Sequence, residues 1–181
     1  MPPIRTSRIL RSCLLMATVV VRYGAFAQAP APQGQGGQTA KPQTIDLAAA
    51  KKMVAAAEQE ALKANAKVGI AVVDSNGDLV FSERIDGASA RGVTSSQGKA
   101  RAALLFGLPT KQVQDFIASG KPIPANITLP TADAAVLVIN QGGLPIVKDG
   151  KVIGGIGVGG SASSEDERFA QAGINAAFPG K

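Results

Sequence analysis

The stretch QGGLPIVKDGKVIGGIGVGGSASSED, residues 141–166, decides the fold, because it encodes two strands, the turn between them and the start of a helix. Asp149-Gly150 predicts a two-residue hairpin turn, since both central positions of such a turn need positive φ, which Asp and Gly tolerate. Glycines then interrupt the second strand at positions 154, 155, 157, 159 and 160. Glycine weakens a strand, so this pattern predicts a place where other backbone, a partner chain or a ligand approaches closely.

Glycines before a helix are also typical of loops that bind phosphate or dinucleotides. Gly155 and Gly157, however, are expected inside a hairpin strand, whereas a phosphate loop lies at a strand-to-helix turn. The acidic residues 165–167 also occupy the positive end of the helix that follows. We therefore interpret the glycines as structural, with close approach of a ligand as the alternative.

The N-terminal residues predict a secretory signal peptide over residues 1–27. Arginines at positions 5, 8 and 11 precede an apolar run over residues 13–21, and Ala25-Phe26-Ala27 forms a cleavage site. That run is shorter than the roughly 20 apolar residues of a membrane span. Residues 28–43 are rich in Pro, Gly and Gln and predict a disordered linker. We expect one folded domain over residues 44–178, in a periplasmic or secreted protein.

Composition excludes several classes of function. The formal net charge of +6 falls to +2 without the predicted signal peptide, because four of the 19 basic residues lie there and all 13 acidic residues lie outside it. This balance argues against a nucleic-acid partner. Cys13 and Tyr23 are the only residues of their types, and the chain has no His or Trp. A Ser-His-Asp triad, a structural zinc site and a His-ligated haem are therefore excluded, and we expect no catalytic residues.

The periodicity of the chain predicts an α+β fold. Asp46 caps a helix over residues 47–64, and Asn76-Gly77 joins strands over 68–73 and 79–85 in a hairpin. Further helices are expected over 94–107, from Pro109-Thr110 to Gly120, and over 164–177. Residues 121–133 predict a loop, and residues 134–139 a central strand before the hairpin. The expected order is α-β-β-α-α-β-β-β-α, an antiparallel sheet of about five strands flanked by helices.

Basic residues stand around the entry of the second expected helix, at Arg91, Lys99 and Arg101. Lys99 lies seven residues before Phe106, so the two share a helix face. A basic side chain above an apolar wall can hold a carboxylate whose carbon skeleton packs below it. The alternative is that the charges are solvated and that the phenylalanine belongs to the core.

Four motifs in order resemble those of one known family. They are Ala71-Val72-Val73-Asp74, the segment from Lys99 to Thr110, the segment 142–146 and the glycine-rich segment 154–160. Over residues 44–178 the chain resembles the GlcG/HbpS-like haem-binding family. The resemblance implies a profilin-like domain that self-associates into dimers and larger rings. Some members are exported, bind haem or its iron and protect against oxidants, whereas others belong to glycolate- or cobalamin-linked operons.

The resemblance implies a haem or tetrapyrrole ligand and a role in haem-iron handling or oxidative stress. Without His, Cys or Tyr after residue 27, haem would use Thr, Lys or Met53 as a weak axial ligand, or be held by its propionates and ring faces. The alternative function is a non-haem accessory or scaffold protein of a periplasmic oxidative pathway. We expect a homo-oligomer, since the chain has few aromatic residues and no disulfide. The candidate ligand-binding residues are Arg91, Thr94, Lys99, Arg101, Phe106, Thr110, Gly155 and Gly157.

Overall fold

The computed structural model divides the chain into two units, residues 1–39 and 40–181. It describes residues 44–121 and 137–179, which all belong to the second unit. The predicted signal peptide and linker lie outside the described residues, as do residues 122–133 of the expected loop. Within the described ranges, no helix is long and apolar enough to cross a membrane.

An antiparallel sheet forms the centre of the second unit. Its strands are β1 (Gly69–Asp74), β2 (Leu79–Arg84), β3 (Gly143–Lys148) and β4 (Lys151–Gly159), in the order β2-β1-β4-β3. The hairpin between β3 and β4 turns at Asp149 and Gly150, with φ of 50° and 75° as the turn type requires. The β1–β2 connection is also tight, because the Asp74 carboxylate accepts hydrogen bonds from the backbone N–H groups of Asn76 and Asp78.

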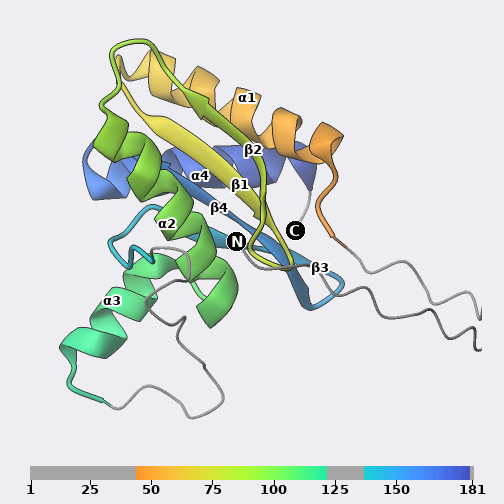
Figure 1. Ribbon diagram of the computed structural model, residues 1–181, viewed down its shortest axis with the longest axis vertical. Helices are drawn as coiled ribbons and strands as arrows, with labels where there is room; N and C mark the ends of the chain where they lie inside the picture. Colours follow the sequence, from red (N-terminus) through yellow and green to blue (C-terminus); the bar gives the residue numbers. More distant parts are fainter. Residues whose placement is uncertain (1–43, 122–136, 180–181) are drawn as a thin grey trace, which may run out of the picture. The chain divides into compact units, whose positions relative to one another are not determined.

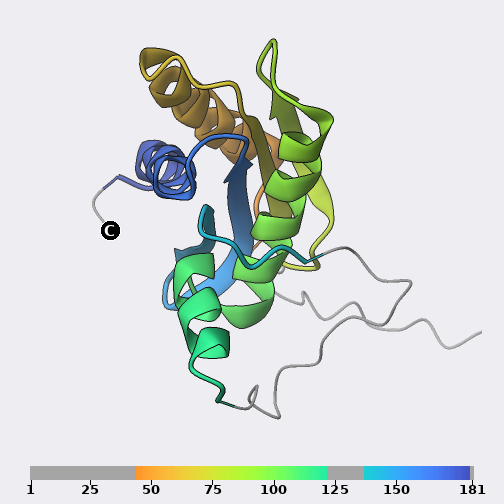
Figure 2. The ribbon, with the colours of Figure 1, turned by 90° about the vertical axis from the view of Figure 1, so that its left-hand side faces the viewer.

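Helices cover both faces of this sheet, as Figure 2 shows. The helices α1 (Leu47–Lys63) and α4 (Ser163–Ala177) pack against each other on one face. The helix α2 (Ala90–Phe106) crosses the other face, with α3 (Thr110–Ala118) beside its end (Figure 1). The core fills the layer between α1, α4 and the sheet, where Met53, Ile156 and Phe169 are fully buried. The α+β class predicted from the sequence is confirmed.

Two details differ from the expected elements. The helix α2 begins at Ala90, four residues before the expected start, because the Ser89 side chain accepts a hydrogen bond from the N–H of Gly92 at 3.1 Å and caps it. The expected central strand over 134–139 is wrong for residues 137–139, and residues 134–136 lie outside the described part. The N–H of Val138 donates to the carbonyl of Gly98 on α2, at 3.1 Å, so this backbone is committed to the helix and not to the sheet. The described sheet therefore has four strands.

The glycines of β4 allow α2 to lie directly on the sheet. A Cβ atom on Gly155 would stand 2.2 Å from the carbonyl oxygen of Ala100, and one on Gly157 would stand 2.1 Å from that of Ser96. Both distances are far inside van der Waals contact, so a side chain at either position would displace the helix. The structural interpretation of these glycines is confirmed, and the backbone that approaches them is that of α2.

Candidate functional site

A polar pocket of about 420 Å³ lies where the first turns of α2 and α4 meet. This volume falls within the range of roughly 300–1,000 Å³ that is common for small-molecule sites. Most of its side chains can donate hydrogen bonds. The lining residues are Ser89, Arg91, Gly92, Ser95, Lys99, Asn140, Gly160, Ser161, Ser163 and Asp166.

A buried ion pair forms the floor of this pocket. The Lys99 ammonium lies 2.8 Å from Oδ2 of Asp166, and the two side chains are only 4% and 2% exposed. Lys99 also donates to the carbonyl oxygen of Val158 at 2.9 Å, while Oδ1 of Asp166 accepts from the N–H of Ser161 at 3.1 Å. The pair thus joins α2, the end of β4 and the start of α4. Removing one partner would leave an uncompensated buried charge, which is strongly destabilising.

The backbone of Gly142 closes over this pair. Its φ is +124°, and a Cβ atom there would stand 2.7 Å from the Lys99 ammonium and 2.7 Å from the Cβ of Asp166. The carbonyl of Gly142 accepts from the N–H of Val158 at 2.9 Å, which fixes the segment before β3. Only glycine fits at this position, because a side chain there would overlap Lys99 and Asp166.

Burial dominates the electrostatics of Asp166. Desolvation raises the pKa of its carboxyl above the ordinary value, although the hydrogen bond and charge of Lys99 and the N–H groups of Ser161 and Gly160 act in the opposite direction. The carboxylate therefore holds a proton more readily than an exposed aspartate does. The pair consists of a lysine ammonium that donates to two oxygens and an acid whose pKa is raised.

The structure brings two of the predicted site residues together. Arg91 and Lys99 both line the pocket, Arg91 as an exposed side chain and Lys99 as part of the floor. The interpretation of Lys99 as a solvated helix charge is therefore wrong. Thr94 is exposed and donates to the carbonyl of Ala90 at 3.2 Å, while Arg101 donates to the carbonyl of Gly77 at 3.2 Å. Neither Thr94 nor Arg101 lines the pocket.

The remaining predicted residues lie elsewhere. Phe106 is half-buried at the end of α2. Thr110 is fully buried, and its hydroxyl accepts from the N–H of Gly143 at 2.9 Å and donates to the carbonyl of the same residue at 3.3 Å. Gly155 and Gly157 lie beneath α2. Ligand binding by these four residues stays a prediction.

Sequence reasoning missed the acid and the small polar residues of the pocket. The signal for the acid was present, because Lys99 recurs with the buried residues Ser96 and Ala103 on one face of α2. A lysine on such a face needs a buried partner. Ser89 and Ser163 are ordinary helix-start residues, and neither they nor Ser95 and Ser161 carry a local signal for a pocket.

Three of the candidate axial ligands for haem iron are buried or already held by other groups. Met53 is fully buried in the core, and the Thr110 hydroxyl is occupied by Gly143. Lys99 is held by Asp166. Within residues 44–121 and 137–179, no three His, Cys, Asp or Glu side chains are placed to hold a metal ion. The donors of the pocket suit the carboxylate side groups of a tetrapyrrole better than its metal.

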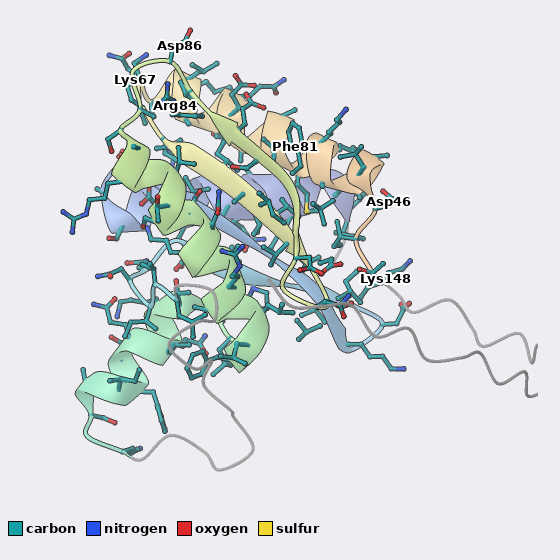
Figure 3. All side chains as sticks on the ribbon, in the orientation of Figure 1. Asp46, Lys67, Phe81, Arg84, Asp86 and Lys148 are labelled. Carbon is teal, nitrogen blue, oxygen red and sulfur yellow. The ribbon has the colours of Figure 1, made fainter. Side chains whose placement is uncertain are left out.

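Two other hollows have a different character. One of about 560 Å³ runs along the outer side of α4 and is lined by Glu60 and Arg168 among others. Another of about 320 Å³ lies where β2 ends, beside Lys67, Arg84 and Asp86, which Figure 3 shows at one corner of the molecule. Neither contains a predicted site residue.

Comparison with known proteins identifies similar chains. The family model described as haem degrading protein HbpS-like matches residues 45–175. The protein GlcG of Escherichia coli K12 is 37% identical over 109 residues, which cover 60% of this chain and 76% of GlcG. The crystal structure of a double mutant of HbpS from Streptomyces reticuli is 33% identical, with a TM-score of 0.68 over 86% of this chain and 99% of that one. A haem complex of PduOC shares the fold, with a TM-score of 0.61 and 24% identity over 70% of this chain and 89% of that one.

Proposed function

This chain belongs to the HbpS-like family of haem-degrading proteins, and from that premise we propose that it binds haem or a related tetrapyrrole and takes part in haem-iron handling. The observation that carries the proposal is the donor-rich pocket, with Arg91 at its mouth and Lys99 in its floor. Carboxylates pair well with guanidinium and ammonium groups when several donors converge. The propionates of haem are the groups that this pocket would hold.

The polar groups of the pocket match the propionates at the edge of the porphyrin and not its iron. The pocket is lined by hydroxyl, amide and charged groups, whereas the porphyrin ring is apolar. The ring would therefore lie outside the pocket, against the surface beside it. Among the candidate axial ligands, Met53, Lys99 and Thr110 are buried, and the exposed Thr94 lies outside the pocket with its hydroxyl donating to the carbonyl of Ala90. Binding through the propionates is therefore the mode that we propose.

We also propose that the protein acts outside the cytoplasm as a homo-oligomer. Export is supported by the arginines, the apolar run and the Ala25-Phe26-Ala27 site of residues 1–27. Mass spectrometry of the protein isolated from the periplasm or the medium tests export, and an intact N-terminus there would contradict cleavage. Sedimentation of the purified protein tests self-association, and a profile at the monomer mass would overturn it.

Titration of the purified protein with hemin tests the ligand. We expect saturable binding with a Soret band that differs from that of free hemin. Arg91→Gln removes one exposed charge at the pocket, and we expect it to weaken binding roughly five-fold, or about 1 kcal/mol.

The matched control is Lys148→Gln, which also removes one exposed positive charge. Gly160 of the pocket lies against the backbone carbonyl of Lys67. Lys148 ends β3, and Figure 3 shows it at the other end of the sheet from Lys67. Its affinity for hemin should equal that of the unmodified protein. A Soret band that stays that of free hemin would refute haem binding, and equal losses in the two variants would refute binding at this pocket.

A further inference from the structure

The ion pair beneath the pocket has the features of a site that exchanges one anion for another. Lys99 and Asp166 both line the pocket, although each is almost completely buried. An anion that enters the pocket therefore meets a cation whose counter-charge is already present. The anion and the Asp166 carboxylate compete for one ammonium group.

Protonation of Asp166 resolves this competition. A neutral carboxyl gives up most of its attraction for Lys99, which leaves the ammonium buried with the Val158 carbonyl and no counter-charge. An oxyanion in the pocket then supplies the missing negative charge. A bound oxyanion in turn favours the protonated form of Asp166, because like charges close together disfavour ionisation. Each event therefore promotes the other.

We infer that the pocket binds an oxyanion together with one proton, and that Asp166 takes up the proton while the oxyanion replaces it as the partner of Lys99. The inference rests on the proposed function, since the propionate of a tetrapyrrole is one source of the oxyanion. A free inorganic oxyanion is the other source. Burial, which raises the pKa of Asp166, supports the exchange by bringing its protonation closer to neutral pH.

Few other charged groups compete for these roles. Arg91 and Lys99 from α2 and Asp166 from α4 are the charged side chains that line the pocket, and β3 and β4 contribute no titratable side chain to its lining. Glu165 precedes Asp166 and is engaged by the Ser161 hydroxyl. On the opposite side of α4, Glu60 of α1 pairs with Arg168 at 3.4 Å. Asp166 is therefore the group in the pocket that can take up the proton.

The direct test uses sulfate, which remains a dianion between pH 4 and 8, and measures its affinity by isothermal titration calorimetry. Repeating the titration in two buffers of different ionisation enthalpy counts the protons taken up. We expect the protein to take up close to one proton for each sulfate bound. The affinity for sulfate should then fall by up to roughly tenfold for each unit of rise in pH. Sulfate binding without proton uptake, or the absence of sulfate binding, would overturn the inference.

The Asp166→Asn variant separates the exchange from a purely structural role of Asp166, because the two predict opposite changes in sulfate affinity. Asp166→Asn is a permanently neutral carboxamide, and we expect it to bind sulfate at least tenfold more tightly at pH 7, with no dependence on pH. The matched control is Asp115→Asn, an exposed position on α3, which should retain the original behaviour. A folded Asp166→Asn protein that binds sulfate equally or more weakly would refute the exchange. The calorimetry of the unmodified protein decides the question if this variant does not fold.

Hemin separates this inference from the proposed function. Hemin binding without any response to sulfate supports haem binding and refutes the oxyanion exchange. Proton-linked sulfate binding without a Soret change supports the exchange with a free oxyanion as its source and refutes haem binding.

Discussion

Gly157→Ala tests whether α2 lies on β4 through backbone contact. An alanine Cβ would stand 2.1 Å from the carbonyl oxygen of Ser96 and 2.6 Å from the amide nitrogen of Ala100. Both are backbone atoms of α2, so no side-chain rotation can relieve the contact. The helix has to move away from the sheet, and it cannot do so without disturbing the Lys99–Asp166 pair one turn along.

The expected loss of stability follows from two opposing effects. Overpacking of a close-packed layer costs about 1–3 kcal/mol, occasionally more. Alanine recovers roughly 0.5–1 kcal/mol that glycine loses in backbone entropy. Because rigid backbone receives the new atom, we expect overpacking at the upper end of its range, and subtracting the recovered entropy leaves a net loss of about 2–2.5 kcal/mol. For a domain of this size that corresponds to a melting temperature lower by roughly 10 °C.

Urea unfolding followed by circular dichroism measures this loss. The control is Gly150→Ala in the β3–β4 turn, where a Cβ meets no atom within 4 Å but φ is +75°. That variant carries only the cost of a left-handed conformation, about 1–2 kcal/mol. If Gly157→Ala loses no more stability than Gly150→Ala, α2 does not contact β4 as the structure describes.

Two further substitutions test electrostatics and hydrogen bonding. Burial raises the pKa of Glu83 above 4.5, and the charge and hydrogen bond of Glu58 raise it further. The contribution of Glu83 to the free energy of unfolding is therefore present below pH 4.5 and is lost as the pH rises through the raised pKa. We expect Glu83→Gln to remove this loss, which urea titrations across pH 4–8 detect, and an unchanged pH profile would contradict it. Thr110→Val leaves the N–H and carbonyl of Gly143 without the hydroxyl, and we expect a loss of about 2 kcal/mol. Thr110→Ser should lose less than half of that, and equal stabilities of the two variants would contradict the hydrogen-bonding role.

Much of the fold followed from local chemistry. The turn at Asp149-Gly150, the Asp46 cap and the left-handed Asn65 that ends α1 are all set by residues that lie within a few positions of each other. The expected strand over 134–139 failed at residues 137–139 for the opposite reason. A run of apolar residues predicts that a segment is buried, but not which group its backbone bonds. The N–H of Val138 donates to a carbonyl on α2, and no local sequence pattern predicts that partner.

The candidate site was predicted only in part. Arg91 and Lys99 could be named as candidates because both are basic and stand around the entry of the second expected helix, although the expected start at residue 94 left Arg91 outside that helix. Asp166 is 67 residues away from Lys99, and its role depends on how α4 meets α2 across the end of β4. Helical periodicity indicates that Lys99 needs an acid, but tertiary packing selects which acid it is.

The strand order has a consequence for how the chain acquires its structure. The strand β4 lies between β1 and β3, yet it is the last strand to be synthesised. A growing chain that ends before residue 151 lacks the β4 partner for one edge of β1, and α2 lacks the glycines of β4 on which it packs. Contacts between distant segments form late, because a long loop must close first. The domain therefore cannot complete its sheet until the residues from 151 onward have emerged from the ribosome, and chaperones can act on it during that interval.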